Sequence, residues 1–361
     1  MPAGTGGDLI DASSSITDDA LVVPSQIFEQ ITIEQEVLNR VYNSTTAVME
    51  AFGYKIENSL NAANTRSLIS AIYGGNNLGT TDTDVVKVGT VNGTVSISLA
   101  TIAADIWTSL QGATIQFRIS SSNASVASGA VFTVSAVNIG ARTFTVTAAE
   151  ADIDFLVTAT SAPCYFVFQT AYGNEQLGLQ ALNESTAAYF SNIDPANSPF
   201  YRGQSLSASS GSLNLELILR GAGLLRNMKV RGNVRLIMPH KQWEKLNNDE
   251  AALVRHTDPS AKDKAVNGFN ELGYAYGSGN IILTSTGLVK NGHAFMYPEG
   301  KVTRLCSRDW RLDPTDGAPE SASTKWLTLR YGNTAAFGRL STGQQLFTPY
   351  LGQTLQITSI V

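Results

Sequence analysis

The 361-residue sequence is poor in the side chains that usually build reactive sites. It has three histidines and only two cysteines, Cys164 and Cys306. Two isolated thiols make neither a disulfide framework nor a zinc site, and no histidine lies at a metal-ligand spacing such as His-x-x-x-His. We therefore expect no metal ion and no cofactor.

Charge is also scarce. Charged residues make up 15% of the chain, against about a quarter in an average globular protein, and the net charge is −5. A protein that binds DNA by neutralising phosphates would carry basic clusters, and the nearest one, residues 220–235, is more simply the solvated end of a helix. Ser, Thr, Asn and Gly replace the missing charges, which suits extended β structure and large subunit contacts.

Long apolar runs and a secretory signal are missing as well. No run of about 18 apolar residues occurs, so we expect no transmembrane helix. Residues 1–19 are rich in Gly, Ser and Asp and lack a basic segment followed by an apolar one, so no signal peptide is expected. We predict no contact with a membrane.

Motifs for nucleophilic or phosphate chemistry are incomplete. Residues 341–343 and 277–279 resemble fragments of a Gly-x-Ser-x-Gly turn, but neither completes it, and no phosphate-binding glycine loop occurs. The carboxylates of Asp152 and Asp154 are interpreted as solvated charges beside loop-like sequence, not as an acid–base pair. We therefore predict that the protein is not an enzyme.

The clearest pattern that is present predicts one long helix over residues 44–73. Apolar residues recur there every four positions, and Gly74-Gly75 then stops the pattern, as glycine does after a helix C-terminus. At 1.5 Å per residue, a helix of about 30 residues is about 45 Å long, which suits a strut better than a compact domain. Gly53 and the Asn-rich stretch 58–64 are places where it could kink.

The sequence before this helix has a different character. Residues 1–24 are small, polar and acidic and are interpreted as a flexible arm. Ser25 is predicted to cap a short helix, and residues 34–41 to form another turn or two.

Residues 76–172 alternate apolar side chains with Ser and Thr, as in 143–147. A period of two marks half-buried strands, and Asn92-Gly93 is a strong hairpin-turn signal. Several short strands at this spacing predict a small sandwich or barrel. We interpret the region as an insert, because the sequences on either side of it make sense when joined.

The remaining sequence mixes helices with strands. Helices are predicted over 213–225 and 242–255, with a short buried strand over 234–238 that ends at Pro239. From Gly268 onward strands and turns dominate, and the segregation of helices from antiparallel-looking strands predicts an α+β fold. The strands expected in this last part cover residues 280–283, 293–297 and 326–331.

Several of these segments resemble the major capsid proteins of tailed bacteriophages. Residues 233–247 are similar to a strand–Pro–helix element of that family, and residues 174–183 to its Gly-Leu loop, with 193–200 following it. Further on, residues 280–295 are similar to the second half of the central domain, and 307–310 to the loop beyond it. The long helix that leads to Gly79 resembles the spine helix, which in some members precedes an inserted β-domain.

The resemblance covers residues 45–350 in pieces and implies a Hong Kong 97-type capsid fold. This is an α+β fold with a spine helix, a peripheral and an axial domain, here with an inserted all-β domain. The implied parts are an N-terminal arm (1–43), the spine helix of the peripheral domain (44–75), the inserted β-rich domain or E-loop replacement (76–172), a peripheral-domain loop and helix (173–232), the axial domain (233–320) and the C-terminal strands of the peripheral domain (321–361).

One departure from the family pattern concerns the start of the chain. The family places an arm and an E-loop hairpin before the spine helix, whereas only about 43 residues precede it here. Either the insert takes over the bracing role of that hairpin or the chain is shortened.

The resemblance also implies a function, that of a major capsid protein. Such a protein self-assembles in the host cytoplasm into the icosahedral head shell of the virion and encloses phage DNA, which it contacts only non-specifically. Its main partner is itself, in hexamers and pentamers, with a portal, a scaffold or a decoration protein as further candidates. The residues predicted as inter-subunit contacts are Trp243, Arg255, His256 and Trp310.

Two alternatives stay open. An encapsulin-like compartment shell shares the fold but encloses cargo enzymes in place of DNA. A surface or tail adhesin with a carbohydrate-binding β-domain shares the period-two strands and the Ser/Thr richness, but it does not share the long helix or the strand–Pro–helix element.

Overall fold

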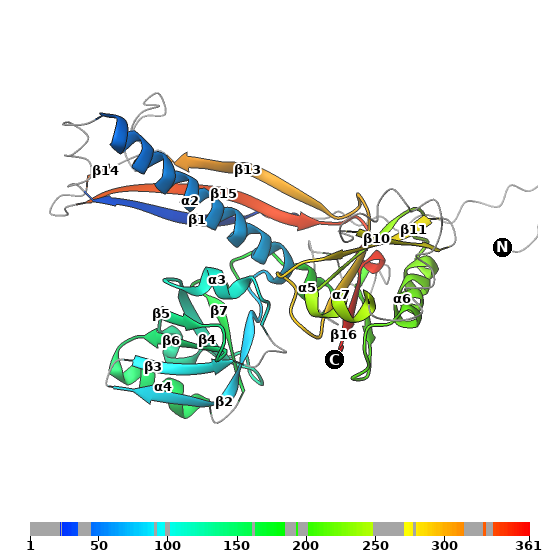
Figure 1. The fold of residues 1–361 in the computed structure, drawn as a ribbon, viewed down its shortest axis with the longest axis horizontal. Coiled ribbons are helices and arrows are strands. Elements are labelled where there is room, and N and C mark those ends of the chain that lie inside the picture. Colours follow the sequence, from blue (N-terminus) through cyan, green and yellow to red (C-terminus); the bar gives the residue numbers. More distant parts are fainter. Residues whose placement is uncertain are drawn as a thin grey trace, which may run out of the picture.

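The chain folds into three connected parts: a long helix lying along an extended sheet, a closed β-barrel, and a mixed sheet flanked by helices (Figure 1). The computed structural model describes residues 22, 24–34, 45–89, 92–97, 102–160, 163–184, 193, 201–247, 271–276, 279–313, 328–329 and 335–361. Every structural statement below concerns these residues.

The long helix is α2, which spans Thr45–Tyr73. It confirms the helix predicted from the sequence, and it continues without a break through Gly53 and residues 58–64. A side chain at Gly53 would meet open space, so no close contact requires glycine at this position. Gly74 follows with a φ of +59°, the left-handed conformation that ends a helix.

The extended sheet runs beside α2 (Figure 1). Its strand order is β1-β15-β13, and the short strand β14 also pairs with β15. β1 and β15 pair in unbroken antiparallel register from Ser25 opposite Gln344 to Glu34 opposite Ala335. The strands are β1 (Ser25–Glu34), β13 (Thr303–Asp313), β14 (Thr328–Leu329) and β15 (Ala335–Phe347).

Two predictions about this sheet were wrong. Residues 25–34 form a strand and not a short helix, because their β-branched isoleucines pair along a strand some 300 positions later in the chain, which local sequence does not reveal. Residues 307–310, expected in a loop, lie within β13, where register shifts between Cys306 and Arg311 give the strand a locally irregular sequence pattern. The turn expected at 34–41 falls almost wholly outside the described residues.

Residues 79–168 contain a closed barrel with the strand order β2-β3-β6-β5-β4-β7. Its interior is filled by aromatic side chains in edge-to-face contact, such as Phe117 with Phe132 at 5.1 Å and Phe144 with Phe166 at 5.5 Å between ring centroids. The predicted strands are therefore present, together with two α-helices. The elements are β2 (Gly79–Val88), β3 (Asn92–Ile97), α3 (Ile106–Leu110), β4 (Thr114–Ile119), the 3-10 turn η2 (Val126–Gly129), β5 (Phe132–Asn138), β6 (Thr143–Thr147), α4 (Glu150–Ala159) and β7 (Cys164–Phe168).

Asp152 and Asp154 lie on α4 and not beside a loop. Asp154 accepts a hydrogen bond from Nζ of Lys87 at 2.5 Å, and Glu150 lies 3.4 Å from the same atom. Glu150 and Asp154 therefore form a surface ion-pair group with Lys87.

The third part is a six-stranded mixed sheet with the order β10-β11-β9-β12-β16-β8. Its core packs against α6, whose buried face includes Ile218 and Leu225. Asn214 caps α6 by accepting a hydrogen bond from the backbone N–H of Leu217. The elements are α5 (Leu179–Glu184), β8 (Gln204–Ser207), α6 (Leu215–Asn227), β9 (Val234–Met238), α7 (His240–Asn247), β10 (Glu271–Tyr276), β11 (Gly279–Ser285), β12 (Ala294–Pro298), the 3-10 turn η5 (Leu351–Gln353) and β16 (Leu355–Thr358).

The mixed sheet crosses the segment boundaries expected from the sequence. It takes β8 from residues 173–232 and β16 from residues 321–361, which pair in parallel. Conversely, β13 belongs to the extended sheet, although it was expected in the 233–320 segment. Contiguous segments cannot describe these sheets, because strands far apart in sequence complete each of them. The helix expected over 242–255 is described only as α7, and residues 248–255 lie outside the described part.

Candidate assembly site

Reactive side chains do not gather within the described ranges. No group of three or more His, Cys, Asp or Glu residues that could hold a metal ion occurs there. Cys164 is buried and Cys306 is exposed on β13, which places the two thiols in different parts of the fold. Nor does any described helix have the length and apolar character needed to span a membrane.

The four predicted contact residues are not brought together. Trp243 lies on α7 and packs against the core of the mixed sheet, whereas Trp310 lies on β13 of the extended sheet. Nε1 of Trp310 is buried and has no hydrogen-bond partner among the described residues. Arg255 and His256 lie outside the described part of the chain, so all four assignments stay predictions.

The three parts meet at the C-terminal end of α2. The hydroxyl of Tyr73 accepts a hydrogen bond from the backbone N–H of Lys290 at 2.8 Å and donates one to the carbonyl of Leu288 at 2.7 Å. Tyr73 is 1% exposed, and burial raises the pKa of its hydroxyl far above the ordinary value. The C-terminal end of α2 is thus held by the loop that joins β11 to β12.

Lys290 extends this contact to the barrel and to α5. Its side chain is buried, and Nζ donates to the carbonyl oxygen of Asn77, just before β2, and to Oε1 of Gln180 on α5 at 3.4 Å. Nζ also lies 4.8 Å from the centroid of the Tyr73 ring, where the face of the ring attracts a cation. Lys290 therefore contacts α2, the segment that leads into the barrel at β2, and α5 beside the mixed sheet.

Close backbone packing surrounds this junction. A Cβ on Gly74 would overlap the backbone of Gln176, and one on Gly178 would overlap the backbone of Ile72. Gly287 has no room for a Cβ because the carboxylate of Asp105, at the start of α3, fills that space. Glycine is required at these positions so that the three parts can approach one another.

His293 lies on the same loop, and Nδ1 of its ring accepts a hydrogen bond from Nε2 of Gln356 at 2.9 Å. Burial, together with the positive charge of Lys290, lowers the pKa of the imidazole from 6.5 to about 4. The histidine is therefore neutral near pH 7 and serves as a hydrogen-bond partner of β16.

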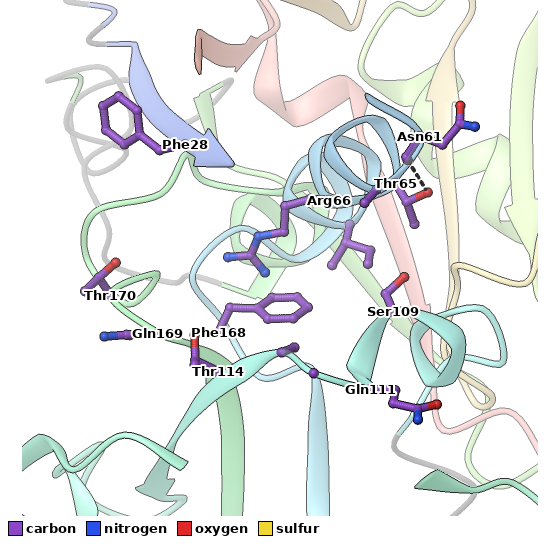
Figure 2. A pocket seen from close by; sticks show the side chains of 14 residues that line it. Phe28, Asn61, Thr65, Arg66, Ser109, Gln111, Thr114, Phe168, Gln169 and Thr170 are labelled. Carbon is purple, nitrogen blue, oxygen red and sulfur yellow. Dashed lines mark hydrogen bonds between the residues drawn. The ribbon is translucent and has the colours of Figure 1, made fainter. Parts of the chain in front are cut away.

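A cleft of about 750 Å³ opens between α2, β1 and the barrel; we call it the α2–barrel cleft (Figure 2). Arg66 of α2 and Phe168 of β7 face each other in it, and the guanidinium carbon lies 3.4 Å from the centroid of the phenyl ring. Its lining residues are Phe28, Asn61, Ala62, Thr65, Arg66, Ile69, Ser109, Gln111, Gly112, Ala113, Thr114, Phe168, Gln169 and Thr170.

Arg66 is fixed in place by a second contact, an ion pair with Glu175. Burial raises the pKa of Glu175 above its ordinary value, while the positive charge of Arg66 opposes that rise. Since an aromatic ring and a carboxylate both hold the guanidinium, the cleft presents a pre-oriented cation among neutral polar side chains.

Large apolar side chains are exposed around this cleft. Phe28 on β1 is 47% exposed, and Leu68 and Tyr54 on α2 are 55% and 68% exposed. Tyr54, Asn61, Thr65 and Leu68 follow one another at helical spacing, so they share one face of α2. That face is neutral apart from Glu57 at its edge, and its exposed Tyr54 and Leu68 suit burial against another protein surface.

Sequence patterns alone missed both the junction and the cleft. Tyr73 was assigned only to the apolar face of the helix, and Arg66 and Lys290 carried no motif. The one usable signal was Gly74-Gly75, which marks the end of the helix but not the close contacts that need glycine.

Comparisons with known proteins give structural likenesses only. No protein-family model and no curated protein matches the chain. Among solved structures, a chain of the capsid asymmetric unit of cyanophage A-1(L) is 13% identical, with 99% of this chain and 85% of that chain covered and a TM-score of 0.49.

Two further structures are similar to smaller degrees. A chain from the satellite phage P4 procapsid, a structure that includes the size determination protein, is 8% identical over 99% of this chain and 80% of that chain, with a TM-score of 0.35. The encapsulin of Synechococcus elongatus PCC 7942 is 12% identical over 50% of this chain and 59% of that chain, with a TM-score of 0.26.

The substitution Tyr73→Phe tests the junction. It removes one hydroxyl and leaves the N–H of Lys290 and the carbonyl of Leu288 buried without that partner, which costs about 1–3 kcal/mol in the free energy of unfolding. Tyr54→Phe on the exposed face of the same helix is the control and should change stability by less than about 0.5 kcal/mol. Denaturant unfolding measures both, and equal effects would contradict the junction.

The pH dependence of stability tests the buried His293. Because its folded pKa of about 4 lies below 6.5, the unfolded chain binds a proton first as the pH falls. The histidine's contribution is complete above about pH 6.5 and is lost between pH 6.5 and 4, by up to about 1.4 kcal/mol per pH unit. His293→Gln should flatten this part of the curve of unfolding free energy against pH, and parallel curves would argue against the assignment.

Proposed function

We propose that this chain is the major subunit of an icosahedral phage head shell, which it builds by assembling with copies of itself around DNA. The observation that carries the proposal is the long helix α2, which lies along the extended sheet and is fixed at its C-terminal end by the Tyr73 and Lys290 contacts. An elongated part of this kind gives neighbouring copies a large surface to pack against.

The distribution of exposed side chains supports the same proposal. A largely neutral face of α2 remains open to solvent, and exposed large apolar residues lie on α2 and on the barrel, such as Tyr54 and Phe155. Moderate patches of this kind suit many small interfaces whose energies add in a closed shell.

The finer architecture is part of the proposal. α2 and the extended sheet would form the peripheral domain, and the mixed sheet with α6 and α7 would form the axial domain. Residues 79–168 would be an insert, supported by the pairing of its first and last strands, in which Gly79 lies opposite Phe166. The two ends of the barrel region therefore lie next to each other.

The net charge of the chain indicates how it would contact DNA inside the shell. A net charge of −5 favours non-specific contact with packaged DNA over tight binding, so the chain's own copies are its principal partner. A portal, a scaffold or a decoration protein belongs to the same proposal.

The proposal predicts that purified protein elutes as megadalton particles or as ring-shaped capsomers. Analytical ultracentrifugation and negative-stain electron microscopy measure this directly, and the nucleic-acid content of particles from infected cells separates a head shell from a cargo compartment. A monodisperse monomer with affinity for glycans would contradict the proposal.

Removal of the barrel tests the insert. Replacing residues 80–165 with Asn-Gly joins Gly79 to Phe166, which already face each other as hairpin neighbours do. The remaining chain should keep its helical circular dichroism and a cooperative unfolding transition. Its melting temperature should fall, because the backbone contact of Asp105 with Gly287 is lost. Only insoluble product, where the parent assembles, would count against an insert.

A further inference from the structure

The α2–barrel cleft has the features of a receptor for an apolar side chain flanked by negative charge. Phe168 and the exposed Phe28 supply aromatic surface, while small residues such as Gly112 and Ala113 leave room. Arg66 is the one charged residue that lines it. Glu175 already pairs with Arg66 but does not line the cleft, so an occupant that combines an aromatic group with a second carboxylate suits it.

Helix α4 carries that combination. Phe155 is 61% exposed, although Ile153 and Leu156 on the same helix are fully buried in the barrel. The acidic residues Glu150, Asp152 and Asp154 surround this turn, and Lys87 balances only part of their charge. An exposed phenylalanine on an acidic helix is unfavourable in water and is stabilised when a partner covers it.

The two features lie on different sides of the barrel. α3 lies on the side toward α2, next to the cleft, and α4 lies on the side away from α2 (Figure 1). One copy therefore cannot fill its own cleft with its own α4. A contact between α4 of one copy and the cleft of the next uses two different surfaces, and such a heterologous contact forms a ring when the rotation between copies closes.

We propose that the α2–barrel cleft receives α4 of a second copy, with Phe155 inserted toward Phe28 and Phe168 and the α4 carboxylates facing Arg66. The inference rests on the proposed self-assembly and names one interface within it. The barrel of each subunit then braces the strut of its neighbour.

The substitution Phe155→Ser tests the inserted side chain. Because burial of a phenylalanine side chain is worth at least one tenfold step in an association constant, the protein concentration needed for assembly should rise about tenfold or more. Ile139→Ser is the matched control, since Ile139 is 58% exposed on the same barrel but lies in the turn after β5, and it should assemble like the parent. Circular dichroism checks that both variants fold.

The receiving side is tested by Thr65→Arg, which fills the cleft and adds a second positive charge beside Arg66. Thr65→Ser is its control, because it keeps a small neutral side chain at the same position in the cleft. Only Thr65→Arg should raise the assembly concentration.

Cross-linking tests the contact itself. In a Cys306→Ser background, Phe155→Cys combined with Asn61→Cys should give a ladder of disulfide-linked oligomers in assembled protein, and neither cysteine alone should do so. If Phe155→Ser assembles normally and the double-cysteine variant gives no ladder, this inference is overturned and the proposed function still stands. A parent chain that forms no particles or capsomers would overturn both.

Discussion

The hydroxyl of Tyr73 is the contact on which the arrangement of the three parts depends. It both donates to and accepts from the loop between β11 and β12, and the next side chain contacted, Lys290, reaches the barrel entry and α5. Each of these groups is buried, so loss of a partner leaves a polar group desolvated and unsatisfied. The direction of the strut relative to the barrel and the mixed sheet is therefore fixed by hydrogen bonds as well as by apolar packing.

Neutral polar groups hold the strut to its sheet in a similar way. Ser341, Thr342 and Gln344 of β15 are fully buried, and the hydroxyl of Ser67 on α2 donates to Oε1 of Gln344 at 2.7 Å. Nε of Arg304 donates to the same oxygen at 2.6 Å. Buried polar contacts of this kind favour one alignment of helix and sheet over others that apolar packing alone would tolerate. These buried contacts explain why the sequence has little charge and is rich in Ser, Thr and Gln.

Local sequence patterns were enough to predict the long helix and the strand-rich region. The four-residue apolar spacing and Gly74-Gly75 predicted α2, and the period-two alternation predicted the barrel strands. Elements that depend on distant partners were not accessible in this way. β1 was misassigned because its register is set by β15 at the other end of the chain, and the mixed sheet needs β16 beside β8.

The site was less accessible than the fold for the same reason. The residues predicted as inter-subunit contacts were Trp243, Arg255, His256 and Trp310, whereas the observed cleft is built by Arg66, Phe28 and Phe168 from three separate elements. None of these has a motif around it, since the site exists only after α2, β1 and β7 have packed.

In the proposed shell, the exposed side of α2 is a surface for other copies of the same chain. A reconstruction of the assembled particle at side-chain resolution would show what covers this side. We expect a straight α2 whose Tyr54 and Leu68 are covered by a neighbouring subunit in every symmetry environment. A particle in which that face of α2 stays open to solvent in all copies would contradict it.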